Sequence, residues 1–394
     1  MTNFQPADEV ELAAIVAKAA ADKTPLAIVG GGTRQGLGRP MQTAATLSTA
    51  GLTGITLYEP AELVLSARAG TPLSTIEALL AEHRQRLAFE PMDHRGIYGS
   101  VGEPTIGAIS AANLSGPRRV QAGAARDSLI GLRAVTGTGT SVKSGGRVMK
   151  NVAGYDLVKF LAGSHGTLGV LSEVTFKLQP APETEATVAI TGLSDARAVS
   201  AMAAALGSPF FVTGAAHAPS EDTEPSRTYI RLDGFAASVA DRAERVRAMM
   251  SEYGPADILG PETSASLWLT ILDLDSLSAP FSTPIWRVSV RPSDGPGVAD
   301  AARAAFPARI LYDWGGGLVL IAGGDGPDAG AAVIRAAVKA VGGHATLVRA
   351  TDDVRHSVPV FEPLAMPLME LTRKLKATFD PAGILNPGRM YAGV

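Results

Sequence analysis

The stretch from Gly30 to Arg39 reads GGGTRQGLGR and directly follows the apolar run PLAIV at residues 25–29. The apolar run is typical of a buried strand, and consecutive glycines allow successive backbone N–H groups to point toward one anion. A hydrogen bond to a charged group contributes about 1.5–3 kcal/mol, so three or four such donors would hold a diphosphate firmly. No Gly-Lys-Ser/Thr follows, and the glycine spacing does not fit the Rossmann fingerprint. Taken alone, the stretch is equally well explained as an ordinary glycine turn.

Two further segments combine glycine with small residues. The segment EPTIGAISAANLSGPRR begins at Glu103, and its backbone could lie along a planar ring system, because glycine lets the main chain approach closely. A helix start with a small-residue packing face explains it equally well. The segment KNVAGYDLVKFLAGSHGTLGVLSEVTFKL begins at Lys150 and predicts a short helix, a glycine turn and a strand; a plain connector is its alternative. The three segments follow one another at distances that a single domain can gather, which favours a shared binding site.

Composition narrows the class of protein. A chain of 394 residues exceeds what one hydrophobic core usually supports, so two domains are expected. With no cysteine, the chain has no disulfide, thiolate zinc site, cysteine-ligated iron–sulfur cluster or thiol catalysis. The net charge of −3 without a basic tract gives no sign of nucleic-acid binding. The N-terminus lacks a signal-peptide pattern and no apolar run is long enough to span a bilayer, so we expect a cytoplasmic protein whose membrane contact, if any, comes through partners.

The pattern of elements predicts an α+β fold in three parts. The proline-rich stretch QPAPETE at residues 179–185 marks a boundary, which separates a first domain at 1–180 from a second at 186–350. In the second domain two rounds of β-α-β-β-α-β follow one another, which predicts a duplicated ferredoxin-like unit and includes a strand at FFVTG. Residues 351–394 are expected to return to the first domain. Within the first domain, Thr71 is expected to cap a helix that has Pro72 in its first turn.

Four motifs in one order carry a family resemblance. GGGTRQGLG, PTIGA with its Asn-Leu-Ser-Gly continuation, KNVAGYDLVKFLAGSHGTLG and FDPAGILNPGRMY together resemble the vanillyl-alcohol-oxidase-type (PCMH-type) FAD-binding family, and within it the smaller FAD-binding subunits of bacterial glycolate oxidases. The resemblance covers residues 1–180 and the C-terminal tail well, and the middle loosely. It implies a two-lobed FAD-binding domain with an α+β cap, and a complex with a larger homologous flavoprotein and an iron–sulfur subunit.

The resemblance also assigns residues to the cofactor. Those that would cradle the FAD diphosphate are Gly30, Gly31, Gly32, Thr33 and Arg34, with Leu37 and Gly38 nearby. Those that would run along the ribityl chain and the flavin are Pro104, Thr105, Gly107, Ala108, Asn113, Ser115 and Gly116. Gly169 and Val170 would meet the adenosine half, and Asn386 would approach the isoalloxazine from the far side. Relatives with covalent flavin use a histidine or cysteine near the loop; this chain has no histidine between Thr24 and Thr49, so non-covalent FAD is expected.

Two departures from the family limit what can be carried over. Relatives that oxidise 2-hydroxy acids alone have a histidine-rich motif late in the cap domain, but here the histidines beyond residue 200 are the isolated His217, His344 and His356. We therefore predict no metal site. The Gly-Ser-Glu-Gly of many relatives is Gly-Ser-His-Gly here, at His165, so no role of that glutamate is transferred.

Oxidation of a 2-hydroxy acid such as glycolate or D-lactate needs a hydride acceptor, a cation for the carboxylate and a base for the hydroxyl proton. FAD would be the first. Arg355 or Arg373 is the candidate cation and His356 the candidate base, while the turn at residues 312–317 could also reach the pocket. For each of them a surface or packing role is the more common explanation of such a residue. The competing hypothesis is an accessory subunit that holds flavin and relays electrons while a homologous partner oxidises the substrate. A stand-alone oxidase using oxygen is a third possibility.

Overall fold

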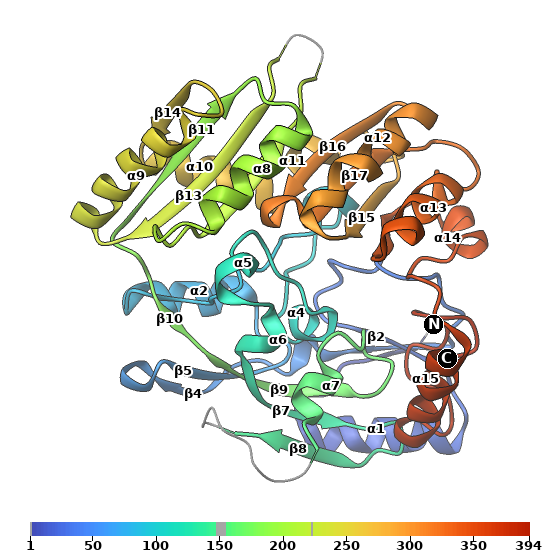
Figure 1. The fold of residues 1–394 in the computed structure, drawn as a ribbon. Coiled ribbons are helices and arrows are strands. Elements are labelled where there is room, and N and C mark those ends of the chain that lie inside the picture. The colour runs from blue at the N-terminus through green and yellow to red at the C-terminus, as the bar shows by residue number, and fades with distance from the viewer. Residues whose placement is uncertain (1, 147–154, 222–223) are drawn as a thin grey trace.

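The computed structural model describes residues 2–146, 155–221 and 224–394 and arranges them as two lobes, one above the other in Figure 1, with the C-terminal helices at one side. Residues 150–154 of the third glycine-rich motif lie outside the described residues. None of the helices in the described ranges has the length and apolar character that crossing a membrane requires.

The lower lobe contains two larger sheets and a two-stranded one, in which β6 (Gln85–Arg86) pairs with β10 (Gln179–Pro180). In the first, parallel strands lie in the order β1-β3-β2, formed by Thr2–Phe4, Ala45–Ser48 and Leu26–Val29. In the second, antiparallel strands lie in the order β4-β5-β9-β7-β8, formed by Ile55–Glu59, Val64–Arg68, Val170–Lys177, Leu129–Val135 and Ser141–Gly145. The helices that pack on them include α1 (Glu9–Ala21), α2 (Leu73–Glu82), α4 (Ile106–Ala112) and α7 (Leu157–Leu161).

Local sequence accounts for where these helices begin. The Asp8 carboxylate caps α1 by accepting from the Glu11 amide at 2.8 Å, and the buried face of α1 is Leu12, Val16 and Ala19. The expected Thr71 cap on α2 is wrong. Pro72 occupies the cap position, and the Thr71 hydroxyl instead donates to the Arg68 carbonyl at 2.7 Å, where it closes the turn after β5.

The upper lobe is one eight-stranded sheet built from two repeats. Its order is β14-β11-β13-β12-β16-β17-β15-β18. The first repeat contributes β11 to β14 at Thr184–Thr191, Gly214–Ala218, Arg227–Gly234 and Ala256–Leu259; the second contributes β15 to β18 at Ile285–Ser289, Ala308–Asp313, Leu318–Gly323 and His344–Arg349. Each repeat follows the β-α-β-β-α-β order expected of a ferredoxin-like unit. The predicted strand at FFVTG is wrong, because β12 begins only at Gly214 and Phe211 is exposed with a φ of +52°.

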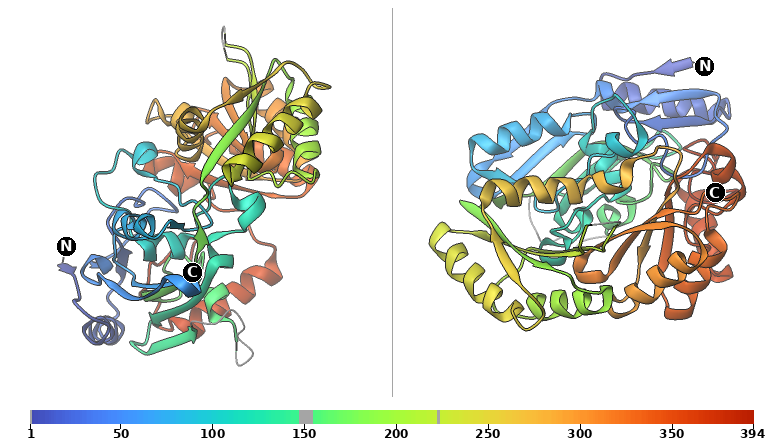
Figure 2. Two further views of the ribbon diagram at one scale, coloured as in Figure 1. Left: turned by 90° about the vertical axis from the view of Figure 1, so that its left-hand side faces the viewer. Right: turned by 90° about the horizontal axis from the view of Figure 1, so that it is seen from above.

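The two faces of this sheet are covered differently (Figure 2). The face away from the lower lobe packs against α8 (Asp195–Leu206), α9 (Ala236–Met250), α12 (Gly295–Ala305) and α13 (Ala331–Val341). The other face is partly covered by α10 (Pro261–Leu272) and α11 (Asp275–Ser278), which lie between the repeats in sequence and which the strand pattern did not predict. Because side chains alternate along a strand, Trp286 and Val288 enter the first core while Ile285 faces the second.

The C-terminal segment runs down from the cap sheet to the lower lobe. After α14 (Asp352–Ser357) and α15 (Met366–Phe379), Leu385 forms a parallel bridge with Leu26 of β2. The Lys376 ammonium on α15 donates to the carbonyls of Thr167 and Leu385 at 2.8 and 2.7 Å. The tail therefore completes the edge of the sheet from which the glycine loop starts. Division of the chain near residues 180 and 350 remains a prediction that these contacts support.

One partly buried carboxylate joins the two repeats of the cap. Strands β12 and β16 meet through the single register pair His217 and Tyr312. At the start of α8, Asp195 accepts from the Tyr312 hydroxyl at 2.6 Å and from Arg303 of α12 at 2.7 Å, and it lies 3.4 Å from the His217 ring. These hydrogen bonds hold the pKa of Asp195 below its usual range despite opposing burial. The Asp195 carboxylate thus adds hydrogen bonds between the two repeats where the pairing of β12 with β16 is short.

Replacing Asp195 by alanine should lower the free energy of unfolding by about 2–4 kcal/mol, because it leaves a buried hydroxyl and a cation without their acceptor. Chemical denaturation measures the loss. The control is Asp300→Ala, which removes an exposed partner of the same Arg303 and should cost less than about 0.5 kcal/mol. Equal effects of the two substitutions would contradict the joining role of Asp195.

Candidate functional site

The glycine loop after β2 forms one wall of a cavity of about 720 Å³. Opposite walls come from α4 and from the turn that precedes β9, and the C-terminal tail closes one side. Small residues dominate: the lining consists of Ile28, Val29, Gly30, Gly31, Gly32, Thr33, Arg34, Gln35, Leu37, Thr49, Ala69, Gly107, Ala108, Ala111, Ala112, His165, Gly166, Gly169, Leu171, Asn386 and Arg389. We call it the groove.

Two segments can form the walls of the groove only because they lack side chains where they meet. A Cβ on Gly31 would lie 1.8 Å from the Glu103 carbonyl oxygen, and a Cβ on Gly107 would lie 2.7 Å from the Ala69 carbonyl oxygen. A Cβ on Gly30 would lie 2.3 Å from the Thr105 hydroxyl, which is buried and has no hydrogen-bond partner among the described residues. Bare backbone and an unpaired hydroxyl fit a ligand that accepts hydrogen bonds, such as a dinucleotide diphosphate.

Cations surround the loop. Arg34 donates to the His94 ring at 3.2 Å and to the Met92 carbonyl at 3.1 Å, and Arg389 donates to the Arg34 carbonyl at 3.1 Å. Burial lowers the pKa of each of these arginines to about 10, so both stay charged at neutral pH. Neither forms an ion pair with a carboxylate in the part of the chain that the structure describes. Two buried, unneutralised cations at the groove favour an anionic ligand.

The tail and the histidine turn are tied together at the far end of the groove. The Asn386 side chain accepts from the Ile28 amide at 2.7 Å and donates to the His165 carbonyl at 2.8 Å. His165 has a φ of +53°, and burial together with nearby Arg389 lowers its pKa to about 3, so its ring is neutral. Its ring lies 5.0 Å from that of Phe361. Asn386 therefore fixes two walls of the groove relative to each other.

A second cavity, of about 1420 Å³, lies between the groove and the cap sheet. It shares the lining residues Leu37, Ala112 and His165 with the groove, so the two spaces adjoin. We call it the cap cavity. Its cap side is formed by alternate residues of the second repeat, namely Arg287, Ser289, Asp313, Leu318, Leu320, His344, Thr346 and Val348. Its floor includes Asn113, Leu114, Ser115, Gly116 and Arg119.

Trp314 connects the cap to that floor. It begins a short 3₁₀ turn after β16, and its indole N–H donates to the Gly116 carbonyl at 3.0 Å. Two guanidinium groups lie over its ring, those of Arg119 at 4.5 Å and Arg287 at 4.9 Å from the ring centre. The turn at residues 312–317 thus reaches the cap cavity, which the sequence analysis gave as one of its alternatives.

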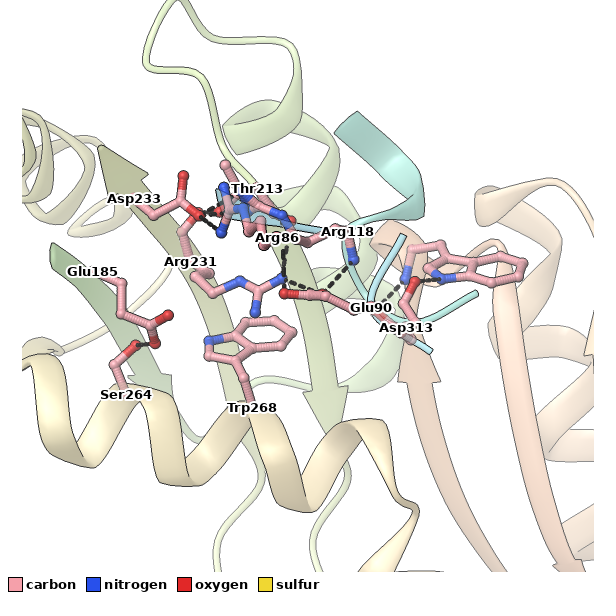
Figure 3. Close-up of polar contacts among 12 residues, drawn as sticks. Arg86, Glu90, Arg118, Glu185, Thr213, Arg231, Asp233, Ser264, Trp268 and Asp313 are labelled. Carbon is pink, nitrogen blue, oxygen red and sulfur yellow. Dashed lines mark hydrogen bonds and ion pairs between the residues drawn. The ribbon is translucent and has the colours of Figure 1, made fainter. Parts of the chain in front are cut away.

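Beside the cap cavity a buried ionic network joins the lobes (Figure 3). Asp233 of β13 pairs with Arg118 and Arg86 of the lower lobe, and Glu90 of the lower lobe accepts from Arg231 of β13 at 2.8 Å. Arg231 also stacks on Trp268 of α10, with 4.5 Å between the guanidinium and the ring centre. Because removing one member would leave an uncompensated buried charge, the network fixes the cap over the cavity.

Asp313 is the acidic group of the cap cavity. It is 4% exposed, and its carboxylate accepts from the Trp314 amide at 2.6 Å. Burial raises its pKa to about 7, and the charge of Glu90 contributes to the rise. The hydrogen bond from Trp314 and the charges of Arg231 and Arg287 lower the pKa, but by less. A carboxyl group that titrates near neutral pH suits proton transfer.

Most residues assigned to the cofactor line one of the two spaces. Ten line the groove: Gly30, Gly31, Gly32, Thr33, Arg34, Leu37, Gly107, Ala108, Gly169 and Asn386. Asn113, Ser115 and Gly116 line the cap cavity instead. The remaining four line neither space: Gly38, whose carbonyl accepts from Arg355, Pro104, Thr105, whose hydroxyl adjoins Gly30, and Val170.

The three residues nominated for acid oxidation do not line the cap cavity. Arg355 is buried and donates to the carbonyls of Gly36 and Gly38 at 2.9 and 2.8 Å, so it braces the glycine loop. His356 and Arg373 are exposed on α14 and α15. Their placement gives the nominated chemistry no support. Successive residues of a helix point about 100° apart, so Arg355 is directed inward while His356 next to it is exposed.

Sequence reasoning missed Arg389 and the polar residues of the cap cavity. Arg389 follows Asn386 in the motif Asn-Pro-Gly-Arg, so its position next to an assigned residue was a usable signal. Asp313 lies in the turn at residues 312–317 that was expected to reach the pocket, but no local signal singled out its side chain or that of Arg287. They come from strands whose register with each other appears only in the folded sheet.

Because its pKa is about 7 in the folded chain against an ordinary 3.8, Asp313 should oppose folding increasingly as pH rises from about 4 to 7, and by a constant amount above 7. Asp313→Asn keeps an acceptor for Trp314 and removes this effect. We expect the variant to gain stability over the parent between pH 4.5 and pH 8, by an amount on the order of 1 kcal/mol or more. Thermal unfolding at both pH values measures it, with exposed Asp257→Asn as control. A stability difference that does not change with pH would contradict the assignment.

Comparison with known proteins agrees with this geometry. The family model "FAD binding domain" matches residues 3–145, and "FAD linked oxidases, C-terminal domain" matches residues 362–390. Glycolate oxidase subunit GlcE of Escherichia coli is 36% identical over 96% of this chain and 95% of that protein. A D-lactate dehydrogenase of Archaeoglobus fulgidus is 31% identical over 45% of this chain and 38% of that protein.

Among solved structures, p-cresol methylhydroxylase with substrate bound superposes with a TM-score of 0.75, covering 99% of this chain and 88% of that one at 13% identity. Alkyldihydroxyacetonephosphate synthase superposes with a TM-score of 0.72, covering 98% of this chain and 75% of that one at 18% identity. These two show the fold, and the matched families identify FAD as the cofactor. The chain belongs to the FAD-linked oxidase family of the vanillyl-alcohol-oxidase (PCMH) type, as does glycolate oxidase subunit GlcE.

Proposed function

We propose that this chain is the FAD-binding subunit of a glycolate-type 2-hydroxy-acid oxidase or dehydrogenase complex, and that it passes electrons from its flavin to a partner. The observation that carries the proposal is that the groove and the cap cavity adjoin, with Leu37, Ala112 and His165 lining both. One elongated molecule can therefore place a diphosphate at the glycine loop and a ring system at the edge of a separate, polar cavity. The near full-length similarity to GlcE supports the same assignment.

The residues of this chain would divide the work. Arg34, Arg389 and the loop amides would hold the diphosphate non-covalently, with the Thr105 hydroxyl as a further donor. Oxidation of a 2-hydroxy acid to a 2-oxo acid removes a hydride from carbon and a proton from the hydroxyl, and bound FAD supplies the hydride acceptor. Asp313 lies in the adjoining cavity and titrates near neutral pH, so it is our candidate acceptor for the proton.

Electrons must then leave the flavin. The sequence has no cysteine to ligate an iron–sulfur cluster, so onward transfer needs a partner's cofactor, a quinone or oxygen. We propose a larger homologous flavoprotein and an iron–sulfur subunit as partners. Such a complex would be cytoplasmic and would reach the inner membrane, if at all, through those partners.

The second candidate is a flavin-holding subunit that relays electrons while its homologous partner oxidises the substrate. The absence of a histidine-rich motif in the sequence of the cap favours it. The polar cap cavity favours the first candidate.

An absorbance spectrum of the purified chain should show bound flavin, and acid precipitation should release it into the supernatant, because the attachment is non-covalent. Anaerobic addition of glycolate or D-lactate should then bleach the flavin, with the chain alone or with its co-expressed partners. Bleaching only when the partners are present would favour the relay role. A flavin that neither acid reduces under either condition would contradict the proposed function.

Gly31→Ala should remove flavin from the purified protein, because the new Cβ would lie 1.8 Å from the Glu103 carbonyl and force the two walls of the groove apart. The matched control is Gly96→Ala in α3 (Arg95–Tyr98), where a Cβ would meet nothing within 4 Å. Flavin content per chain measures both. A folded Gly31→Ala variant that retains full flavin would contradict the assignment of the loop.

A further inference from the structure

Two arginines without an acidic partner face the cap cavity from opposite sides. Arg287 projects from β15 on the cavity face of the sheet, since Trp286 and Val288 on either side of it belong to the helix-covered core. Arg119 belongs to α5 (Arg119–Ala122) on the floor. Across residues 2–146, 155–221 and 224–394, neither guanidinium has a hydrogen bond or an ion pair.

Both guanidinium groups are held close to one aromatic ring. They lie 4.5 and 4.9 Å from the centre of the Trp314 ring, and the indole is fixed in turn by its hydrogen bond to Gly116. Burial and the charge of Arg119 lower the pKa of Arg287 to about 10, so both remain cations at neutral pH. A fold that brings two like charges together while leaving their donors free places a strong positive potential in the cavity.

The other anionic groups near the cavity have partners or sites of their own. The diphosphate of FAD belongs to the groove, where Arg34 and Arg389 lie. Asp313 accepts from the Trp314 amide and makes no ion pair with Arg287 in the described chain. The arginines of the neighbouring interlobe network, Arg118 and Arg231, are neutralised by Asp233 and Glu90.

We infer that the cap cavity binds a small carboxylate between Arg287 and Arg119, with the Trp314 ring supporting both guanidinium groups. The planar fork of arginine matches a carboxylate through two parallel hydrogen bonds. Leu318 and Leu320 line the same cavity, and they favour a short acid over one with a charged tail. Asp313 faces the same space from the end of β16, so a 2-hydroxyl on the bound acid would have an acceptor. The inference rests on the proposed function, because it names the substrate class of that site.

The test is a calorimetric titration of the flavin-loaded chain with oxalate, a small carboxylate that has no C–H bond to oxidise. Arg287→Met and Arg119→Met should each weaken oxalate binding by about 10-fold or more, since each loses a charge-assisted hydrogen-bonding pair. Arg287→Lys should recover part of the affinity, because it restores the charge without the fork. The control is Arg126→Met at the rim of the same cavity, whose guanidinium lies 3.9 Å from Asp127 and should not affect binding.

A second measurement separates binding from a structural role. Oxalate should raise the thermal unfolding temperature of the parent and not of Arg287→Met, whereas the two proteins should unfold at similar temperatures without oxalate. Inorganic phosphate at equal ionic strength distinguishes a carboxylate site from a general anion site, and equal binding of both would contradict the inference. So would oxalate binding that neither methionine variant weakens. Because the titration can be repeated on flavin-free protein, failure of the carboxylate site is distinguishable from failure of flavin binding.

Discussion

The contact between the glycine loop and the segment that begins at Glu103 is the constraint on which the rest of the site depends. There the chain packs backbone against backbone, and a single Cβ on Gly31 would overlap the Glu103 carbonyl. This contact sets the width of the groove and leaves amide groups and the Thr105 hydroxyl without side chains in front of them. Arg355 and Arg389 donate hydrogen bonds to carbonyls of the loop, and the C-terminal segment brings both arginines to it. The tail is therefore part of the cofactor site although it is more than 300 residues away in sequence.

The sequence predicted those parts of the site that leave a local pattern of residues. The glycine loop and the segment around Gly107 were singled out because glycines and small residues form a local pattern, whereas the family resemblance assigned them and the tail residue Asn386 to the cofactor. The β-α-β-β-α-β repeats were found because alternation of apolar residues is also local. The predictions of a strand at FFVTG and of a helix cap at Thr71 were wrong, because a short apolar run or a single hydroxyl residue is compatible with more than one local structure.

The polar residues of the cap cavity could not be found in this way. Arg287 and Asp313 lie on β15 and β16, which are not neighbours in the sheet, and β17 separates them. Whether their side chains face the lower lobe or the helices depends on a register that one residue of slippage would reverse. The nomination of His356 rested on the ordinary pKa of histidine, whereas the structure places an aspartate in the cavity and raises its pKa by burial. A pKa raised by burial depends on the folded structure and cannot be predicted from the residue type alone.

Duplication of the cap allowed its two halves to take on different tasks on the same face of one sheet. In the first repeat, Arg231 and Asp233 face the lower lobe and are neutralised there by Glu90 and Arg118, so this half attaches the cap. In the second repeat the cation on that face, Arg287, interacts electrostatically with Asp313 but forms no ion pair in the described part of the chain, so its donors remain available to a ligand. The difference lies in the opposing surface: acidic and basic partners rise from the lower lobe under β13, while under β15 the floor is the small-residue segment around Gly116. The same glycine-rich backbone that admits the cofactor thus leaves the cation above it unpaired, and this makes room for an acid substrate.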